Sequence, residues 1–267
     1  MRARRKPSPE AMVRAIYRKL MRAWGPQHWW PAETPFEVIV GAILGQNTSW
    51  TNVERALASL RSANALTIDA IRELPAGKLE QLVRSSGYFR QKAQRLKTFV
   101  SFVDLNYGGS LEKMFAVPTA QLRPLLLSLK GIGHETADDI LLYAGNHEIF
   151  VVDAYARRIL ERHQAIQPAA KYDEIRALIE SALKRELPES KTSADLVDPL
   201  KLVVHTPSAM SSAKRTRAAQ VYNEMHGLFV QVGKHYCRKQ EPYCEECPLR
   251  SLLPQQNSAC RPAAGTF

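Results

Sequence analysis

The stretch Leu-Lys-Gly-Ile-Gly-His-Glu-Thr-Ala-Asp-Asp-Ile-Leu-Leu at residues 129–142 decides the fold of this 267-residue chain. The helical pattern of residues 118–128 ends before its two glycines, and a second helical pattern begins after them. Gly131 and Gly133 permit a tight turn that a side chain would obstruct, and Ile132 can fill the space between the helices. The turn leaves backbone N–H groups free at the start of the second helix, where a phosphate can dock. The residues expected to bind that phosphate are Gly131, Ile132, Gly133, His134 and Thr136.

Helical patterns also dominate the rest of the chain. Ser8 is a suitable N-cap, Pro9 fits the first position of a helix, and apolar residues then recur at helical spacing. Further helices are expected near residues 35–44, 50–62, 67–73, 76–85, 89–106, 111–116, 118–128, 134–144, 153–162, 171–185 and 216–237. The β-branched run at 149–152 is interpreted as an extended connector between helices. The sequence therefore predicts an all-α protein.

The composition indicates a globular protein with an anionic partner. Hydrophobic residues make up 45% of the chain, and the formal net charge is +11 at a sequence pI of about 9.6. The phosphate backbone of nucleic acid is the common partner of so basic a chain, although a basic surface also serves solubility. Because no long apolar run and no secretory signal are present, we expect no membrane span and a cytoplasmic, intracellular location.

Asp153 is a second candidate for chemistry. It lies twenty residues after Gly133, follows the apolar connector and precedes a helical pattern. The plain interpretation is a helix N-cap, which is a common role for aspartate. An N-cap carboxylate is also held rigidly and stays ionised beside the helix dipole. It can therefore stabilise a positively charged sugar in a glycosidic transition state, or orient the attacking water.

The Leu-Lys-Gly-Ile-Gly-His-Glu-Thr-Ala stretch, followed at this interval by Val-Val-Asp, resembles the helix-hairpin-helix Gly/Pro…Asp superfamily of DNA glycosylases, which includes endonuclease III. The resemblance extends from about residue 10 to residue 260, except for the Ser-, Lys- and Pro-rich stretch 189–214, which is interpreted as an inserted loop. It implies an all-α, two-domain helix-hairpin-helix DNA glycosylase fold with a C-terminal [4Fe-4S] cluster loop, and a DNA cleft between the domains.

The resemblance also implies boundaries and roles. The central domain is expected at 33–148, and the second at 1–32 plus 149–267. Asp153 is then the catalytic aspartate, and residues 129–136 form the hairpin that grips a phosphate. The implied partner is double-stranded DNA containing a damaged base, bound by a monomer.

Glu135 occupies the position where bifunctional members of the superfamily carry a lysine. That lysine forms a Schiff base with the sugar, and a carboxylate cannot be the amine nucleophile. Lys130 is nearby, but in the family pattern it precedes the hairpin and faces elsewhere. We therefore expect a monofunctional glycosylase without strong β-lyase activity.

Three of the four tryptophans, Trp29, Trp30 and Trp50, lie within 22 residues. Core packing is the ordinary role of a tryptophan, yet Trp29-Trp30-Pro31 in a non-helical linker is hard to bury wholly. This stretch resembles the 3-methyladenine DNA glycosylase III branch, which carries Trp-Trp-Pro and Gln-Asn-Thr-x-aromatic at matching places. The resemblance implies a pocket in which Trp29 and Trp50 stack a flipped, cationic alkylated purine, with Trp30 and Pro31 close by. It also assigns Gln46 to fill the gap left by the extruded nucleotide; a buried, hydrogen-bonded glutamine is the alternative.

All four cysteines fall in one pattern, Cys237-x6-Cys244-x2-Cys247-x12-Cys260. Clustered thiols without a secretory signal indicate a metal or cluster site in a reducing compartment, and the spacing fits either zinc or a [4Fe-4S] cluster. The resemblance favours the cluster, because endonuclease III carries the first three cysteines at the same spacing. The last interval is seven residues longer here, which leaves open whether Cys260 is the fourth ligand. Some members of the 3-methyladenine branch lack the cluster, so this chain combines features of both.

Other polar residues are assigned to surfaces or packing. These are Arg90 and Lys92 as a solvated helix face, Asp138 and Asp139 as a polar helix face, and His226 and Lys234 as packing residues that could also approach the pocket.

The sequence thus predicts a DNA glycosylase of base excision repair that removes an alkylated purine such as 3-methyladenine. Two other functions stay open. An endonuclease III-like enzyme would release oxidised or deaminated pyrimidines, such as thymine glycol or uracil. A non-catalytic DNA-binding protein, or a zinc-binding DNA module, would use the hairpin and the cysteines without the chemistry of Asp153.

Overall fold

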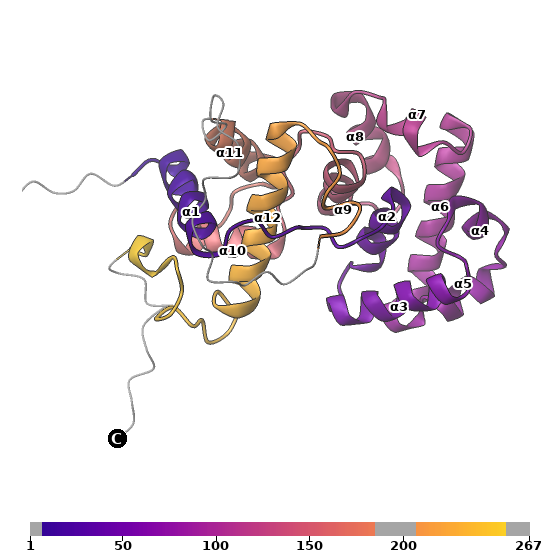
Figure 1. Cartoon of the computed structure of the whole chain (residues 1–267), viewed down its shortest axis with the longest axis horizontal. Coiled ribbons are helices and arrows are strands. Elements are labelled where there is room, and N and C mark those ends of the chain that lie inside the picture. The colour runs from indigo at the N-terminus through magenta and orange to yellow at the C-terminus, as the bar shows by residue number, and fades with distance from the viewer. Residues whose placement is uncertain (1–6, 185–206, 255–267) are drawn as a thin grey trace, which may run out of the picture. The chain divides into compact units, whose positions relative to one another are not determined.

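The computed structural model describes residues 7–184 and 207–254, and the regular elements in these ranges are helical (Figure 1). The α-helices are α1 Pro9–Trp24, α2 Pro35–Leu44, α3 Trp50–Ser62, α4 Ile68–Glu73, α5 Ala76–Leu82, α6 Phe89–Tyr107, α7 Leu111–Phe115, α8 Thr119–Ser128, α9 His134–Asp139, α10 Ala154–Arg162, α11 Tyr172–Lys184 and α12 Arg217–His235. Shorter elements are the 3-10 turns η1 Arg84–Ser86 and η4 Arg250–Leu252 and the π-helical turn η2 Ile140–Ala144. No strand occurs in the described residues, so the predicted all-α class is confirmed.

Several helices begin where local sequence chemistry predicts. The Ser8 side chain accepts a hydrogen bond from the Ala11 backbone N–H at 3.2 Å, and Pro9 lies in the first turn of α1. Thr34 caps α2 in the same way, again followed by a proline. Helices α2 and α3 have the bounds that the sequence predicted.

Two predicted helices are divided in the structure. The helix expected at 76–85 ends at Leu82, because Val83 leaves the helical region with φ −96° and ψ 9°, and η1 follows. The helix expected at 134–144 is α-helical to Asp139 and continues as the π turn to Ala144. Such π turns are frequent at functional sites.

The chain divides into two compact units. Of the described residues, unit 1 contains 7–29, 150–184 and 215–254, and unit 2 contains 30–149 and 207–214. Residues 30–32 and 207–214 therefore lie in unit 2, whereas the family resemblance places them in the second domain. Hydrogen bonds explain the difference: Ser208 Oγ donates to the Trp30 carbonyl at 3.1 Å, and the Met210 N–H donates to the Ala32 carbonyl at 3.0 Å.

Unit 2 is built around α2. Every α2 residue after Pro35 is buried, as expected for a helix that is apolar nearly all round. Helices α3 and α6 and the π turn η2 pack against it. Glu37 is the charged exception, and the Arg61 guanidinium pairs with its carboxylate. At Gly41 an added Cβ would lie 3.2 Å from the Trp30 ring, so glycine lets this ring approach the helix backbone.

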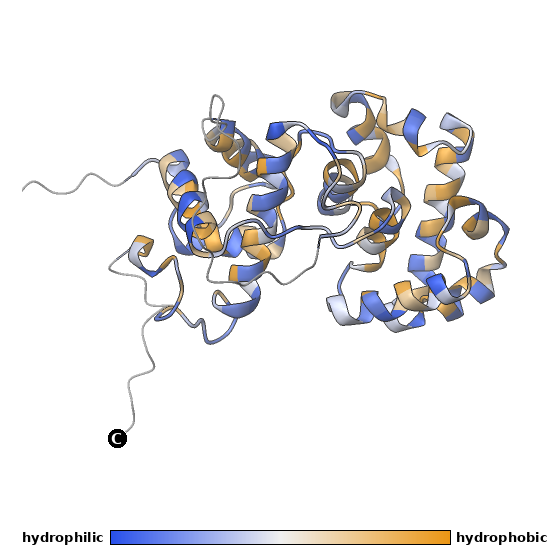
Figure 2. Ribbon diagram, viewed as in Figure 1, coloured by the Kyte–Doolittle hydropathy of each residue, from blue (hydrophilic) through white to orange (hydrophobic). Residues whose placement is uncertain are grey.

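Unit 1 is built around α12, against which α10 and α11 pack. A Cβ at Gly233 would lie only 2.0 Å from the Tyr155 ring, so glycine is needed for this ring to rest on α12. The Arg158 guanidinium lies 5.1 Å from the centroid of the same ring, which it covers by a cation–π contact. The hydrophobic and hydrophilic sides of the helices can be followed in Figure 2. Among the described residues, no helix combines the length and apolar character that a membrane span requires.

Candidate active site

The turn between α8 and α9 has the tight geometry that its glycines predict. Gly131 has a φ of 91°, in the region that favours glycine, and a Cβ there would lie 2.2 Å from the Arg95 side chain. Ile132 is only 6% exposed, and its N–H donates to the Leu129 carbonyl at 3.0 Å. Gly131 thus has two independent reasons to be glycine, and Ile132 fills the turn as expected.

Gly133 differs from the sequence-based expectation. Its backbone is extended, with φ −95° and ψ −179°, and an added Cβ would meet no atom within 4 Å. The prediction that a side chain would obstruct the turn is therefore wrong for Gly133. Glycine at this position instead keeps the approach to the start of α9 open.

A buried ion pair joins the two helices of the hairpin. Arg123 on α8 donates to both carboxylate oxygens of Asp138 on α9, at 2.7 and 3.0 Å. Asp138 has 0% exposure, so its charge depends on this bidentate contact. The interpretation of Asp138 and Asp139 as a polar helix face is wrong, because both residues are buried.

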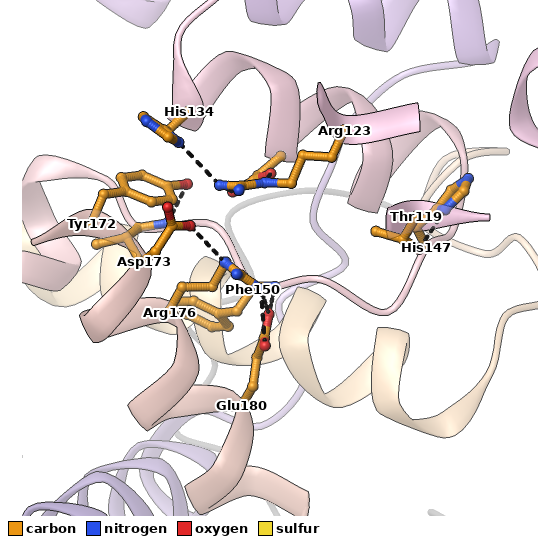
Figure 3. A network of polar contacts seen from close by, with 11 residues as sticks. Thr119, Arg123, His134, His147, Phe150, Tyr172, Asp173, Arg176 and Glu180 are labelled. Carbon is orange, nitrogen blue, oxygen red and sulfur yellow. Dashed lines mark hydrogen bonds and ion pairs between the residues drawn. The ribbon is translucent and has the colours of Figure 1, made fainter. Parts of the chain in front are cut away.

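The same arginine orients His134, the first residue of α9 (Figure 3). Arg123 Nη2 lies 3.1 Å from His134 Nδ1. A guanidinium can only donate, so Nδ1 accepts and the proton of a neutral His134 ring is on Nε2. Arg123 and Asp138 therefore fix the orientation of an exposed side chain at the predicted phosphate site.

Gln46, in the segment after α2, is hydrogen-bonded to the hairpin. Its Nε2 donates to the Gly131 carbonyl at 2.9 Å and to Thr136 Oγ1 at 2.8 Å, and its Oε1 accepts from Arg95. Of the two roles that the sequence left open, the hydrogen bonds match the packing role, although the side chain is half-buried and not buried, and insertion into DNA stays a prediction. Insertion of this side chain into DNA would break all three contacts. Arg95, which contacts both Gln46 and Gly131, carried no signal in the sequence.

Lys92 on α6 is 1% exposed, so the prediction of a solvated face is wrong for this residue. Its Nζ donates to the Leu44 carbonyl at 2.8 Å and to the Ser86 carbonyl at 2.6 Å. Burial, assisted by the positive charge of Arg95, lowers the pKa of Lys92 to about 8. Lys92 thus caps the last carbonyl of α2 and the end of η1. Arg90 is exposed, as predicted.

Asp153 lies at the N-terminus of α10 in unit 1, as the sequence predicts. Its Oδ1 accepts a hydrogen bond from the Ala156 N–H at 2.6 Å, and the residue is 9% exposed. Its Oδ2 lies 3.4 Å from Nε2 of His226 on α12. The N-cap hydrogen bond holds the carboxylate at the positive end of the α10 dipole. The site therefore holds a fixed negative charge beside a histidine.

The connector that carries Asp153 is anchored to α11 (Figure 3). The Phe150 N–H donates to Glu180 Oε1 at 3.0 Å, and Arg176 Nη1 holds the Glu180 carboxylate at 3.0 and 3.1 Å. The Val152 N–H donates to the Tyr172 hydroxyl at 3.2 Å. In a sheet, a neighbouring strand would accept the hydrogen bonds of these backbone N–H groups. Here side chains of α11 accept them, and this fixes the extended connector that leads to Asp153.

The tryptophans are more buried than the pocket hypothesis requires. Trp30, in unit 2, is 6% exposed and packs edge to face on Trp50, with ring centroids 5.0 Å apart at 82°. Trp29, in unit 1, is 5% exposed, and Lys234 Nζ lies 5.8 Å from its ring centroid. Pro31 is half-buried. Trp30 is therefore a core residue of unit 2, Trp50 is half-buried beside it, and one face of Trp29 attracts a cation.

Three cysteines line one small cavity of unit 1: Cys237, Cys244 and Cys247, together with Arg162 and His163. Arg162 Nη1 lies 3.1 Å from Cys237 Sγ, as a donor to a thiolate would. Burial raises the pKa of the Cys247 thiol to about 11, and a positive charge close by would favour its thiolate.

The donor set fits a thiolate-bound metal or cluster, which would supply that positive charge. The geometry is not that of an assembled site, since no group of three or more His, Cys, Asp or Glu in residues 7–184 and 207–254 is arranged to hold a metal ion. Cys260 lies outside the described residues.

Comparisons with known proteins agree with the hairpin and the fold. Residues 40–185 match the HhH-GPD superfamily base excision DNA repair protein model. A Methanocaldococcus jannaschii protein, named provisionally as a DNA repair glycosylase, is 40% identical over 90% of this chain and 95% of its own length. Endonuclease III of Thermotoga maritima is 26% identical over 90% of this chain and 91% of its own length.

Solved structures give the same result. The 3-methyladenine DNA glycosylase of H. pylori, bound to 1,N6-ethenoadenine, has a TM-score of 0.66 at 28% identity over 85% of this chain and 98% of that one. A trapped endonuclease III–DNA covalent intermediate has a TM-score of 0.66 at 19% identity over 91% of this chain and 95% of that one.

An all-helical chain with this hairpin and this family match belongs to the HhH-GPD superfamily of base excision DNA repair proteins. Within the superfamily its relatives and its fold are those of the endonuclease III-like DNA glycosylases, as the sequence motifs indicated.

Proposed function

We propose that this protein is a monofunctional DNA glycosylase that hydrolyses the N-glycosidic bond of a flipped, alkylated purine such as 3-methyladenine. The observation that carries the proposal is the geometry of Asp153: its Oδ1 is fixed at 2.6 Å by the Ala156 N–H at the start of α10. A carboxylate preorganised in this way stabilises the positive charge that develops on the sugar as the base departs. A non-catalytic DNA-binding protein could use the same residue as an N-cap, but it would need no carboxylate that acts on the sugar.

The chemistry needs little else from the protein. A base alkylated at a ring nitrogen is positively charged and leaves as a neutral molecule, so no strong general acid is required. Asp153 stabilises the sugar cation and orients the water that attacks it. The hairpin residues Gly131 to Thr136 bind a DNA phosphate, with His134 oriented by Arg123 at 3.1 Å.

Glu135 supports a reaction that stops at base release. It occupies the second position of α9, where bifunctional relatives carry the lysine nucleophile, and its side chain is exposed. Without an amine at this position no Schiff base forms with the sugar. The expected product is therefore an abasic site in an intact strand.

Two observations support a purine substrate: the similarity to the H. pylori glycosylase and the affinity of the Trp29 ring for a cation. The H. pylori relative binds 1,N6-ethenoadenine and has 28% identity to this chain. Trp29 offers a ring face that attracts a cation, here Lys234 Nζ at 5.8 Å. The same lysine favours a second candidate, an enzyme for neutral damaged pyrimidines, because an ammonium group on that face opposes a cationic base. The T. maritima endonuclease III likeness points the same way.

A lesion panel separates these two functions. Duplexes of one sequence would carry 3-methyladenine, 1,N6-ethenoadenine, thymine glycol, uracil or no lesion, and free base and strand breaks would be measured separately. We expect release of the alkylated purine, strand breaks only after alkali, and no covalent adduct on borohydride reduction. Release of thymine glycol or uracil without any alkylated purine would overturn the substrate proposal. A borohydride adduct would overturn the monofunctional one.

For the cysteines, we propose that Cys237, Cys244, Cys247 and Cys260 hold a [4Fe-4S] cluster, with zinc as the alternative. The cluster would be structural, cross-linking the segment after α12. The support is the shared cavity of three of these thiols and the Arg162 donor at 3.1 Å from Cys237 Sγ.

The cluster is tested on protein purified without oxygen. We expect a brown protein that contains iron and acid-labile sulfide in equal amounts and no zinc. In Cys247→Ser the colour and iron should be lost, whereas Ser251→Ala, in the exposed turn η4, should keep both. Stoichiometric zinc in a colourless protein would contradict the cluster.

A further inference from the structure

His226 is a buried polar residue of α12 that the proposed reaction does not yet use. It is 4% exposed, and its Nε2 lies 3.4 Å from Oδ2 of Asp153. The two residues are 73 positions apart in the sequence and come from different helices of the same unit. A buried imidazole this close to the candidate catalytic carboxylate calls for an explanation.

The chemistry of the two groups fixes the direction of the contact. An ionised carboxylate only accepts hydrogen bonds, so a stable arrangement places a proton on the facing Nε2. The other carboxylate oxygen, Oδ1, already accepts the Ala156 N–H at 2.6 Å. The 3.4 Å between Nε2 and Oδ2 is an ion-pair distance and not that of a completed hydrogen bond. A donor at each oxygen would define the plane of the Asp153 carboxylate, whereas the N-cap bond alone lets it rotate about χ2.

The imidazole itself is held in one orientation. The Phe150 ring meets the His226 ring edge to face, with centroids 6.2 Å apart at 89°. Phe150 is at the start of the connector that leads to Asp153, and its N–H is fixed by Glu180 at 3.0 Å. Phe150 also meets Phe229 of α12 edge to face, with ring centroids 6.3 Å apart at 88°. The residues that hold the connector therefore also orient the histidine.

We propose that His226 is a positioning residue for Asp153, whose imidazole N–H fixes the second carboxylate oxygen while the N-terminus of α10 fixes the first. The inference rests on the proposed function, in which Asp153 stabilises the sugar cation. Its consequence is specific: the histidine acts on the chemical step, because it sets where the carboxylate charge lies. It contributes nothing to the grip on DNA phosphate, which belongs to the hairpin.

The test uses three substitutions of the full-length protein with any lesion that the wild type releases. His226→Leu keeps an apolar side chain in the buried site but has no donor. His226→Gln places an amide N–H near the position of Nε2. Phe229→Leu is the matched control, because it alters packing on Phe150 without touching a polar group of Asp153. Single-turnover base release, DNA affinity and the midpoint of thermal unfolding would be measured for each.

We expect His226→Leu to lower the rate constant of base release by about 10- to 100-fold, as removal of orienting partners of functional groups commonly does, with unchanged DNA affinity. His226→Gln should recover most of the rate, and Phe229→Leu should stay within about threefold of the wild type. Equal rates for His226→Leu and the wild type would overturn the inference. So would a loss in His226→Leu that Phe229→Leu matches, or one that His226→Gln does not recover, because a packing role predicts both.

Asp153→Asn, measured in parallel, separates the two proposals. If it abolishes base release while His226→Leu has no effect, the function stands and the positioning role fails. If Asp153→Asn releases base at the wild-type rate, the proposed mechanism itself fails.

Discussion

Asp153→Asn is expected to lower the rate of base release by about 10³-fold or more, with little change in DNA affinity or stability. Asparagine is as good an N-cap as aspartate, so the bond from the Ala156 N–H, now 2.6 Å, and the start of α10 should survive. What is lost is the negative charge. A neutral amide cannot stabilise a sugar cation to the same extent, nor polarise the attacking water.

The measurement is single-turnover release of the lesion base by wild type and variant, with DNA affinity from a binding titration. Asp69→Asn is a suitable control, since this carboxylate on α4 has a side chain 86% exposed and belongs to unit 2. It should change neither quantity. A variant that binds DNA normally and does not release base would support a catalytic role for Asp153. Equal loss of binding and release would instead indicate a structural one.

Local sequence chemistry was enough to predict the helices and the position of Asp153. Helix starts depend on a side chain and a backbone N–H within three or four residues, as at Ser8, whose cap the structure places as predicted, and at Thr34. The glycine turn is local as well, because Gly131 needs a positive φ, here 91°. Asp153 could be found because its signals are all local: an N-cap residue, the apolar connector before it and its spacing of twenty residues from Gly133.

The errors concern charged residues whose partners are distant in sequence. Lys92 seemed solvated because its own helix is polar around it, but its Nζ donates at 2.8 Å to the carbonyl of Leu44, 48 residues earlier. Asp138 seemed exposed for the same reason, and its partner is Arg123, 15 residues earlier on another helix. His226 lies 73 residues from Asp153. No periodicity in the sequence reports such pairs, because burial of a charge depends on what tertiary packing brings to it.

The tryptophans illustrate the limit of a motif. Trp29-Trp30-Pro31 suggested one aromatic pocket, which stays a prediction, and within unit 2 Trp30 packs edge to face on Trp50 with ring centroids 5.0 Å apart. Packing of an aromatic ring and stacking of a base require the same side chain. Whether a given ring packs in the core or stacks on a base depends on the residues around it, and those residues are distant in sequence.

Arg123→Met is expected to lower the free energy of unfolding by about 3–5 kcal/mol, because it removes the bidentate guanidinium from the buried Asp138 carboxylate. Asp138 has 0% exposure, and both of its oxygens accept from Arg123, at 2.7 and 3.0 Å. The same change frees the His134 ring from the donor at 3.1 Å, so DNA affinity should fall as well. Urea unfolding followed by circular dichroism gives the first quantity, and a binding titration gives the second.

Two further variants define what the pair contributes. Arg123→Met combined with Asp138→Leu removes both charges, and should recover most of the lost stability, since apolar replacement of a buried pair is often neutral. Its DNA affinity should remain low, because His134 is still without its orienting donor. Asp69→Ala, which removes the exposed carboxylate from a surface ion pair with Arg72, should cost no more than about 0.5 kcal/mol. If Arg123→Met costs as little as that surface change, the Arg123–Asp138 pair contributes little to stability, and Ile132 and the Gln46 hydrogen bonds hold the hairpin instead.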